Sequence, residues 1–380
     1  MSRAVYAART MRLLDRYLFR ELLTPLAYCL GGFLIFWISF DLFTELPELQ
    51  DRKLHLLDII AYVAAMTPEF LVIVLPIVLL LALLYTLANH ARHNEITAMR
   101  AAGVSLWRLC APYFAAGIIA SLALFALNEL VVPHSTDWAW QIKCRYVHMP
   151  DDNVTSQFHG FINAREHRLW QFDEYHVQIA EMINPKASWT LPDGSWRQVQ
   201  AERACFTNRT WTLFNAKEYA QPATNDDLVP ILETNVLVMP EFDETPKQIR
   251  SEIKISGYLS LRGPRKPDIS LAEIYDYLQL HPDLPHDQAA RLLTQLHGRL
   301  AAPWTCLVVV IIAIPFGAVP GRRNLFFGVA GGIFICFTFF VVQSVGLALG
   351  QGGHLHAWLA AWLPNLIFAA AGLALAARVR

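Results

Sequence analysis

The stretch Ala88-Asn-His-Ala-Arg-His-Asn-Glu-Ile-Thr-Ala-Met-Arg-Ala-Ala-Gly-Val-Ser-Leu-Trp-Arg108 separates two long apolar runs, which places it at a membrane surface. Its pattern differs from that of a plain loop. Ile96, Met99 and Ala102 recur at helical spacing, while charged side chains take the remaining faces. The stretch therefore predicts a short amphipathic helix between two membrane spans.

Signals for the start and the end of this helix flank the apolar positions. Asn94 can cap the helix, Glu95 puts a negative charge into its first turn, and Gly103 supplies a stop. Arg100 lies on the polar side with Glu95. A short amphipathic helix on the inner face of a membrane is suited to receive a mechanical displacement from another protein. A plain interfacial helix would show the same periodicity.

Composition places the whole chain in a membrane. Of 380 residues, 54% are hydrophobic and 17% charged, with a mean hydropathy of +0.32. Several uninterrupted apolar runs reach the roughly 20 residues that a helix needs to cross a bilayer. The net charge of -1 excludes a bulk electrostatic attraction to nucleic acid. The chain is therefore expected to be an integral membrane protein.

Hydropathy predicts six transmembrane helices in two groups of three, around a polar insert. The domains expected are residues 1–132 with the first three spans and the surface helix at about 89–105, residues 133–295, and residues 296–380 with the last three spans. The spans themselves are predicted at residues 22–43, 58–88, 106–132, 300–319, 325–349 and 358–377, with a loop at 44–57.

The polar insert predicts an all-β, jellyroll-like domain followed by one helix. Short β-prone runs alternate with turn residues, with no helical pattern between them. Ser270 and Glu273 form a capping-box pattern for the helix, and residues 286–299 resemble a helical stalk. The strands are predicted at residues 169–175, 177–183, 189–191, 196–206 and 211–214.

Basic residues set the expected orientation. Arginines precede the first span, and Arg322, Arg323, Arg378 and Arg380 follow later spans. Because basic residues favour the cytoplasmic side, both termini and the surface helix are predicted inside and the β domain outside.

A few polar residues within the apolar runs are candidates for a lipid path or gate, since such residues are costly in a bilayer. They are Asp41, Glu69, Gln343 and Ser344, with Asn128 and Glu129 at the end of the third span. All except Gln343 and Ser344 could instead lie at the solvated ends of the spans.

Motifs for catalysis and cofactors do not occur. His354 and His356 lack a third ligand for a metal. No Walker lysine motif is present, so any ATP and Mg²⁺ are expected on another protein. Cys144 and Cys205 are the two cysteines of the polar insert, and a disulfide between them is one possibility.

Several motifs resemble the permease subunits of the lipopolysaccharide export system, the LptF/LptG family, over nearly the whole chain. They are Leu14-Asp-Arg-Tyr17, Pro68-Glu69 with Pro76, Asn94-Glu-Ile-Thr-Ala-Met-Arg-Ala-Ala-Gly-Val-Ser105, Arg299-Leu-Ala-Ala-Pro303, Ile314-Pro-Phe-Gly317 and Ala361-Trp-Leu-Pro-Asn-Leu-Ile-Phe368.

The resemblance implies a transport subunit without catalysis of its own, in a bacterial inner membrane. A homodimer or heterodimer of such permeases would bind two copies of an ABC-type ATPase, with Glu95 engaging the ATPase. It would pass lipopolysaccharide to external β-jellyroll domains and a periplasmic protein bridge. The first and fifth spans would form the lateral gate.

One departure concerns the anionic lipid. The G-type members carry lysines at the outer end of the first span, where this chain has Asp41 and Glu45. Either the partner permease supplies the cations, or Lys143, Arg145 and Arg299 do, or the lipid is less anionic. The F or G type and the exact cargo therefore stay open.

Two other functions compete with lipid export. One is a mechanical ABC permease that acts on an external protein, although six spans disfavour it. The other is a membrane enzyme that uses Asp41, Glu69 or Glu129 as acid or base. These carboxylates lie on different spans, without a recognisable nucleophile or metal set.

Overall fold

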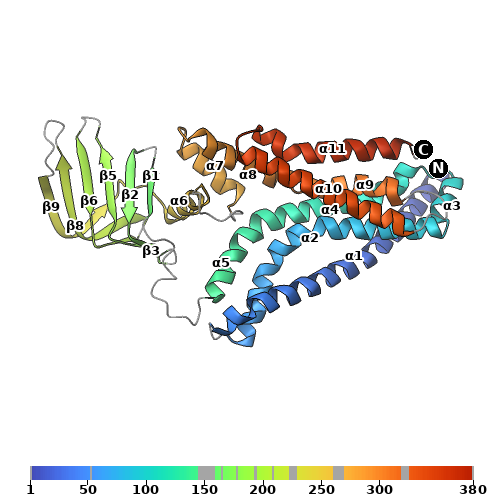
Figure 1. Ribbon diagram of the computed structural model, residues 1–380, viewed down its shortest axis with the longest axis horizontal. Helices are drawn as coiled ribbons and strands as arrows, with labels where there is room; N and C mark the ends of the chain where they lie inside the picture. Colours follow the sequence, from blue (N-terminus) through green and yellow to red (C-terminus); the bar gives the residue numbers. More distant parts are fainter. Residues whose placement is uncertain are drawn as a thin grey trace. The chain divides into compact units, whose positions relative to one another are not determined.

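The computed structural model of the chain is mostly helical, with an antiparallel β-sheet region inserted between two groups of helices (Figure 1). The structure describes residues 2–51, 54–143, 159–163, 166–176, 179–191, 195–207, 209–221, 229–259, 269–317 and 325–378. The chain divides into two units. The membrane unit joins Met1–Lys143 to Ala289–Arg380, and the β unit is Cys144–Gln288.

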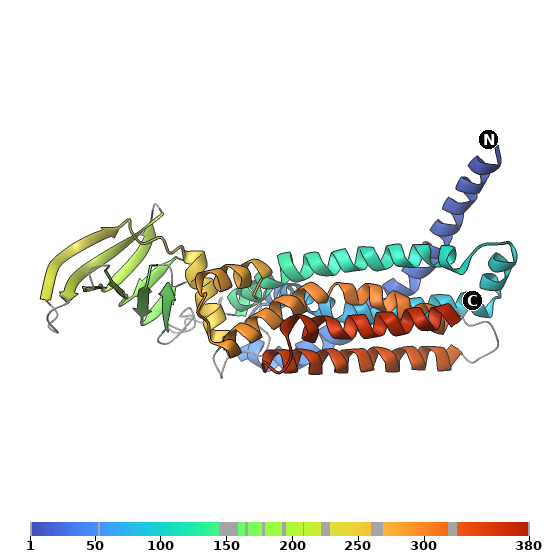
Figure 2. The same ribbon diagram turned by 90° about the horizontal axis from the view of Figure 1, so that it is seen from above.

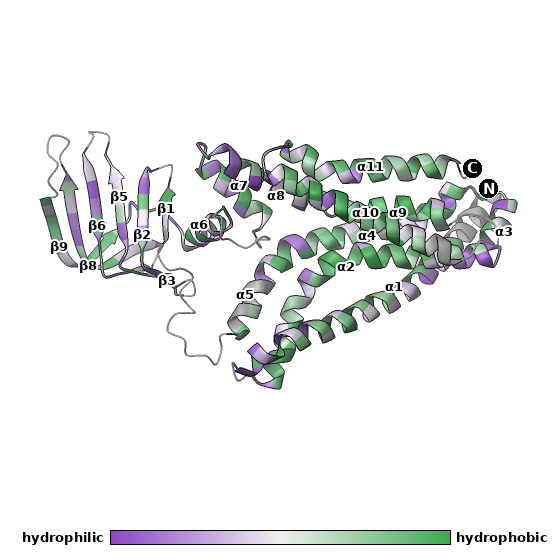
Figure 3. Ribbon diagram, in the orientation of Figure 1, coloured by the Kyte–Doolittle hydropathy of each residue, from purple (hydrophilic) through white to green (hydrophobic). Residues whose placement is uncertain are grey.

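The membrane unit consists of long apolar helices, which Figure 3 shows largely in green. Five helices of the described residues are long and apolar enough to cross a membrane, or six if α8 and α9, bent by 52°, form one span. The predicted fold class is confirmed. The helices are α1 Ser2–Asp51, α2 Leu56–Arg92, α3 Glu95–Ala101, α4 Leu106–Ala126, the π-helical turn η1 Leu127–Val131, α5 Val132–Lys143, α8 His286–Ala301, α9 Trp304–Gly317, α10 Leu325–Gln351 and α11 Ala357–Arg378.

The loop predicted at residues 44–57 is wrong over most of its length, because α1 continues to Asp51. Leu49 lies within this charged segment and is fully buried against Tyr62 and Ala139. This packing keeps the last turns of α1 helical, although their polar composition predicts a loop. Burial of one leucine side chain contributes about 1.5–3 kcal/mol, enough to outweigh the local sequence.

The third span also extends further than its apolar run. Helix α4 passes through η1 into α5, which extends over residues 133–143, the start of the region that composition assigned to the polar insert. The π-helical turn has a local cause in Pro133. A proline ring clashes with the carbonyl four residues earlier, here that of Glu129, and the wider turn relieves this clash.

Helices pack closely where glycines face a neighbour. Figures 1 and 2 show α10 and α11, both red, lying side by side. A Cβ atom at Gly346 would lie 2.7 Å from the carbonyl oxygen of Ala360. A Cβ atom at Gly350 would lie 2.6 Å from the Cβ of Ala360. Small residues at this contact allow the backbones to approach, as is common between membrane helices.

The β unit is a curled antiparallel sheet in the order β1-β2-β5-β6-β8-β7-β4-β3, with β9 paired to β8. Every described pairing is antiparallel. The strands are β1 His159–Asn163, β2 Arg168–Phe172, β3 Glu174–His176, β4 Glu181–Ile183, β5 Lys186–Thr190, β6 Trp196–Gln200, β7 Arg203–Thr207, β8 Thr210–Gln221 and β9 Val229–Met239.

The strand predicted at residues 196–206 is two strands, because Ala201 and Glu202 leave the ladder. Their N–H groups donate to the carbonyls of Pro185 and Phe214. β8 runs well beyond residue 214, and β1 and β9 were not predicted. The alternation of β8 is clear only in its first half, where Trp211 and Leu213 are buried.

An aromatic core supports the sheet, with Trp170, Trp211 and Phe242 at its centre. Two helices follow the strands, α6 Pro246–Leu259 and α7 Leu271–Leu280. The predicted capping box is confirmed: the Ser270 hydroxyl accepts from the N–H of Glu273, and Glu273 accepts from the N–H of Ser270. Helix α6 was not predicted.

Candidate functional site

The surface helix predicted between the second and third spans is α3, Glu95–Ala101. It starts after Asn94, whose backbone is left-handed with φ of 57°. Asn94 is the N-cap residue, as predicted, but its side chain makes no capping hydrogen bond. Asparagine serves here because its short polar side chain tolerates this conformation. The residue turns the chain sharply from α2 into α3.

The stop at Gly103 is confirmed. Gly103 has φ of 87°, a conformation that side chains disfavour. Its N–H donates to the carbonyl of Arg100 at 2.9 Å, and the N–H of Val104 donates to Met99 at 3.1 Å. These two bonds form a Schellman motif. α3 is therefore defined at both ends by backbone geometry that the sequence specifies.

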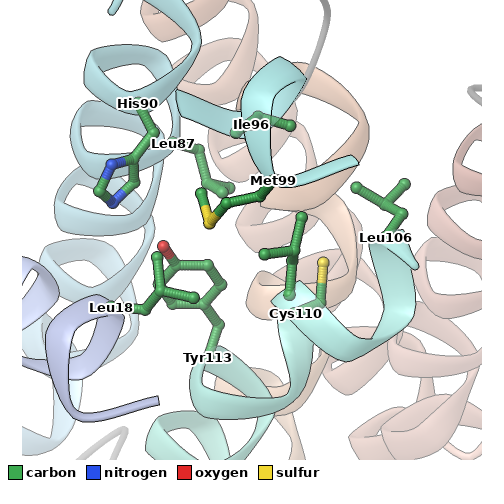
Figure 4. A pocket seen from close by; sticks show the side chains of 9 residues that line it. Leu18, Leu87, His90, Ile96, Met99, Leu106, Cys110 and Tyr113 are labelled. Carbon is green, nitrogen blue, oxygen red and sulfur yellow. The ribbon is translucent and has the colours of Figure 1, made fainter. Parts of the chain in front are cut away.

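The two faces of α3 have different surroundings. Ile96 is buried and Met99 packs against the same apolar cluster, whereas Thr97, Ala98 and Arg100 are exposed. Figure 4 shows Met99 reaching from α3 into a pocket that His90 faces from α2. This pocket has a volume of only about 10 Å³ and is lined by Leu18, Leu87, His90, Ile96, Met99, Leu106, Leu109, Cys110 and Tyr113. α3 is thus seated on the membrane unit by its apolar face.

Glu95 forms hydrogen bonds with side chains of its own chain. Its Oε2 lies 2.7 Å from Nδ1 of His90 and accepts a hydrogen bond from the Tyr17 hydroxyl at 3.0 Å. Because a carboxylate only accepts, Nδ1 of His90 must carry the proton. The His90 ring is buried, while 35% of the Glu95 side chain remains exposed. Glu95 therefore fastens the start of α3 to α1 and α2.

A second polar contact fastens the other flank of α3. Arg108, in the first turn of α4, places Nη2 2.6 Å from Oδ2 of Asp15 on α1. Asp15 and Tyr17 belong to a family motif in the sequence, but their contacts with Arg108 and Glu95 were not predicted. Neither could be found from spacing alone, because the partners lie 93 and 78 positions away in the chain.

Arg299 lies at the turn η1 rather than on an open surface. It is 7% exposed; its Nη1 donates to the Asn128 carbonyl at 3.0 Å and lies 3.7 Å from Oε2 of Glu129. The N–H of Val132 bonds to Leu127, which removes the usual donor to Asn128. The next N–H that could reach Asn128 is absent, since residue 133 is proline. Arg299 satisfies the carbonyl that the π-helical turn exposes.

The break between α8 and α9 brings two further motifs together. Asn365 on α11 is buried, and its Nδ2 donates to the carbonyl of Ala301 at 2.9 Å. The helix is interrupted at Ala302 and Pro303, so this carbonyl needs a donor from elsewhere. The Arg299–Pro303 and Ala361–Phe368 motifs thus meet at one bend.

The other predicted lipid-path residues lie on separate helices. Asp41 is on α1, Glu69 on α2, and Gln343 and Ser344 on α10. Of these four residues Ser344 is exposed and the other three are partly buried. Lys143 ends α5. Arg145 and Cys144 lie outside the described residues, and Cys205 is a free cysteine.

Within the described residues, no group of three or more His, Cys, Asp or Glu side chains could hold a metal ion. The β unit has a pocket of about 130 Å³ with a partly polar lining of Phe161, Asn163, Glu166, Asp243, Glu244, Gln248, Glu252 and Leu280. Burial raises the pKa of Glu252 in this pocket to about 8.

The comparison with known families bears on the whole chain. The family model described as lipopolysaccharide export system permease LptF/LptG matches residues 16–378. None of the curated proteins compared with the chain matches it. The family match spans both units and includes α3, the bend between α8 and α9, and the β sheet.

Proposed function

The chain belongs to the LptF/LptG family of lipopolysaccharide export permeases, and from this premise we propose that an ABC-type ATPase drives it through α3. The ATPase, in two copies, would bind ATP and Mg²⁺ on the cytoplasmic side. The chain itself would take lipopolysaccharide from the inner membrane without catalysis of its own.

The proposal rests on how α3 packs against the membrane unit. Its apolar face is packed into the membrane unit, and its opposite face presents Thr97, Ala98 and Arg100 to solvent. Small side chains allow a groove of another protein to close around the helix, and Arg100 offers a charge for orientation. A merely interfacial helix would instead direct its apolar face to lipid.

Glu95 has two roles in this proposal. Its Oε2 holds α3 against Tyr17 and His90, and the exposed part of the side chain contacts a basic group of the ATPase. Asn94, Met99 and Gly103 shape and seat the helix. Because Glu95 also fixes the position of α3, its substitution would not separate docking from positioning.

The β unit is proposed to lie in the periplasm and to pass lipid onward, with both chain termini in the cytoplasm. Among the described strands, β9 pairs only with β8 and exposes Ile231, Leu232, Val236 and Val238. An exposed aliphatic edge strand suits addition of a strand from another sheet. A periplasmic bridge protein of the same β architecture is the proposed occupant.

A second permease of the same family completes the proposed transporter. Arg299 already faces Glu129 and the Asn128 carbonyl. Cations for the lipid phosphates are therefore proposed to come from the second permease, or from Lys143 and Arg145. Asp41, Glu69, Gln343 and Ser344 remain proposed residues of the lipid path.

The test of the proposal targets the exposed face of α3. Arg100→Glu combined with Ala101→Trp is expected to reduce co-purification of the ATPase at least tenfold, a loss of roughly 1.4 kcal/mol. Both side chains are exposed, so folding of the membrane unit should be unaffected. Quantitative mass spectrometry of the complex purified from membranes measures the ratio of ATPase to permease.

The matched control is Lys186→Glu, a charge reversal of the same size on an exposed residue of β5. It should leave the ATPase ratio unchanged. An unchanged ratio in the α3 variant as well would show that this helix does not dock the ATPase.

A further inference from the structure

The motif Leu14-Asp-Arg-Tyr17 places polar groups on both sides of an apolar stripe of α1. Successive residues of a helix are rotated by roughly 100°, so Leu14 and Leu18 share one face, between Tyr17 and Asp15. Arg16 points away from this face and is exposed. This face of α1 can therefore bind a neighbouring segment through apolar contacts in the middle and one polar contact on each side.

The surface that it holds is the α3 segment. Leu18 is buried in the same apolar cluster as Ile96, and Met99 packs against that cluster. Tyr17 donates to Glu95, at the start of α3, and Asp15 pairs with Arg108, just beyond its end. Both flanks of the segment are thus bonded to a single turn of α1.

α1 is also well suited to carry a displacement across the membrane. It is continuous from Ser2 to Asp51, and its far end packs against α2 and α5 through Leu49. A movement of α3 would pull or push the cytoplasmic end of α1 through two polar contacts at once. Because the contacts lie on opposite sides of the apolar stripe, they would transmit rotation as well as translation.

We propose that Asp15–Arg108 and Tyr17–Glu95–His90 form a joint through which the ATPase-driven movement of α3 reaches α1. The inference rests on the proposed function of α3 and assigns positioning roles to the five residues of the joint. Apart from Glu95, which takes part in both, it separates the docking of the ATPase, on the exposed face of α3, from transmission, on the opposite face. Loss of the joint should therefore leave the ATPase bound and stop lipid transfer.

The experiment uses charge reversal in the purified permease–ATPase complex, reconstituted in vesicles that contain lipopolysaccharide. Asp15→Arg and Arg108→Asp alone should each reduce ATP-dependent lipid transfer roughly tenfold, while the ATPase ratio stays within about twofold of wild type. The double variant restores the pair with exchanged charges and should recover most of the transfer. Tyr17→Phe, which removes one hydroxyl, should also lower transfer.

A second readout follows the movement itself. Spin labels at Phe43, on the far part of α1, and at Leu130 in η1 occupy exposed positions. Trapping the ATPase in a nucleotide-bound state should change the distance between the labels in wild type, and not in Asp15→Arg. Arg16→Asp, a charge reversal on the exposed face of the same turn, should behave as wild type in both assays.

The outcomes separate the two proposals. Wild-type transfer by the single reversals, or a double variant no better than they are, would overturn the joint. The same would follow if Asp15→Arg kept the full distance change. A wild-type complex without bound ATPase would instead overturn the proposed function.

Discussion

Replacing Arg168 by glutamine is expected to destabilise the β unit by about 3–5 kcal/mol, because it leaves a buried carboxylate without its cation. Nη1 of Arg168 lies 2.8 Å from both carboxylate oxygens of Glu244, and the two side chains are 5% and 4% exposed. The guanidinium also lies 4.2 Å from the ring centroid of Phe242. Loss of one partner therefore affects both charge pairing and the aromatic core.

Hydrogen exchange of the full-length protein in detergent measures this effect at the amides of β2 and β8. The matched control is Arg203→Gln, which removes an arginine paired with Glu181 at 3.1 Å but 55% exposed. An exposed pair contributes only about 0–1 kcal/mol. Equal losses of protection in the two variants would contradict a special role for the buried pair.

The second large effect is expected in the membrane unit at Arg299. Arg299→Gln should destabilise this unit by about 3–5 kcal/mol, because Glu129 would lose its buried cation. The carbonyl of Asn128 would also lose the Nη1 donor that replaces the missing N–H of Pro133. Thermal unfolding of the full-length protein in detergent should show a clearly lower midpoint.

A double variant distinguishes charge pairing from simple packing at this site. Arg299→Leu with Glu129→Leu leaves no buried charge, and should recover most of the stability lost in Arg299→Gln. If the double variant is as unstable as the single one, the interaction with Asn128, rather than the ion pair, dominates.

Local signals could be predicted from the sequence. The position of α3, the stop at Gly103 and the capping box at Ser270 each depend on residues within one helical turn. The amphipathic face with Ile96 and Met99 follows from periodicity in the same way. The number of spans and the inserted β region follow from apolar runs and turn residues.

Features that depend on distant contacts could not be predicted in the same way. The last turns of α1 are held by Leu49 against α2 and α5, which composition does not reveal. The roles of Arg299 and Asn365 depend on carbonyls exposed at Asn128 and Ala301, far away in the chain. Glu95 was predicted as a partner of another protein, and its contacts with Tyr17 and His90 required the fold.

The central claim is that ATP hydrolysis by an ATPase docked on α3 drives the transfer of lipopolysaccharide to the β unit. It is tested most directly by a photo-crosslinking residue at Val238, an exposed position on β9, in the purified complex in vesicles that contain lipopolysaccharide. Crosslinks between β9 and lipopolysaccharide should form with ATP, be absent without it, and be lost in the Arg100→Glu, Ala101→Trp variant. Crosslinks at the same level with and without ATP, in a complex that hydrolyses ATP, would contradict the claim.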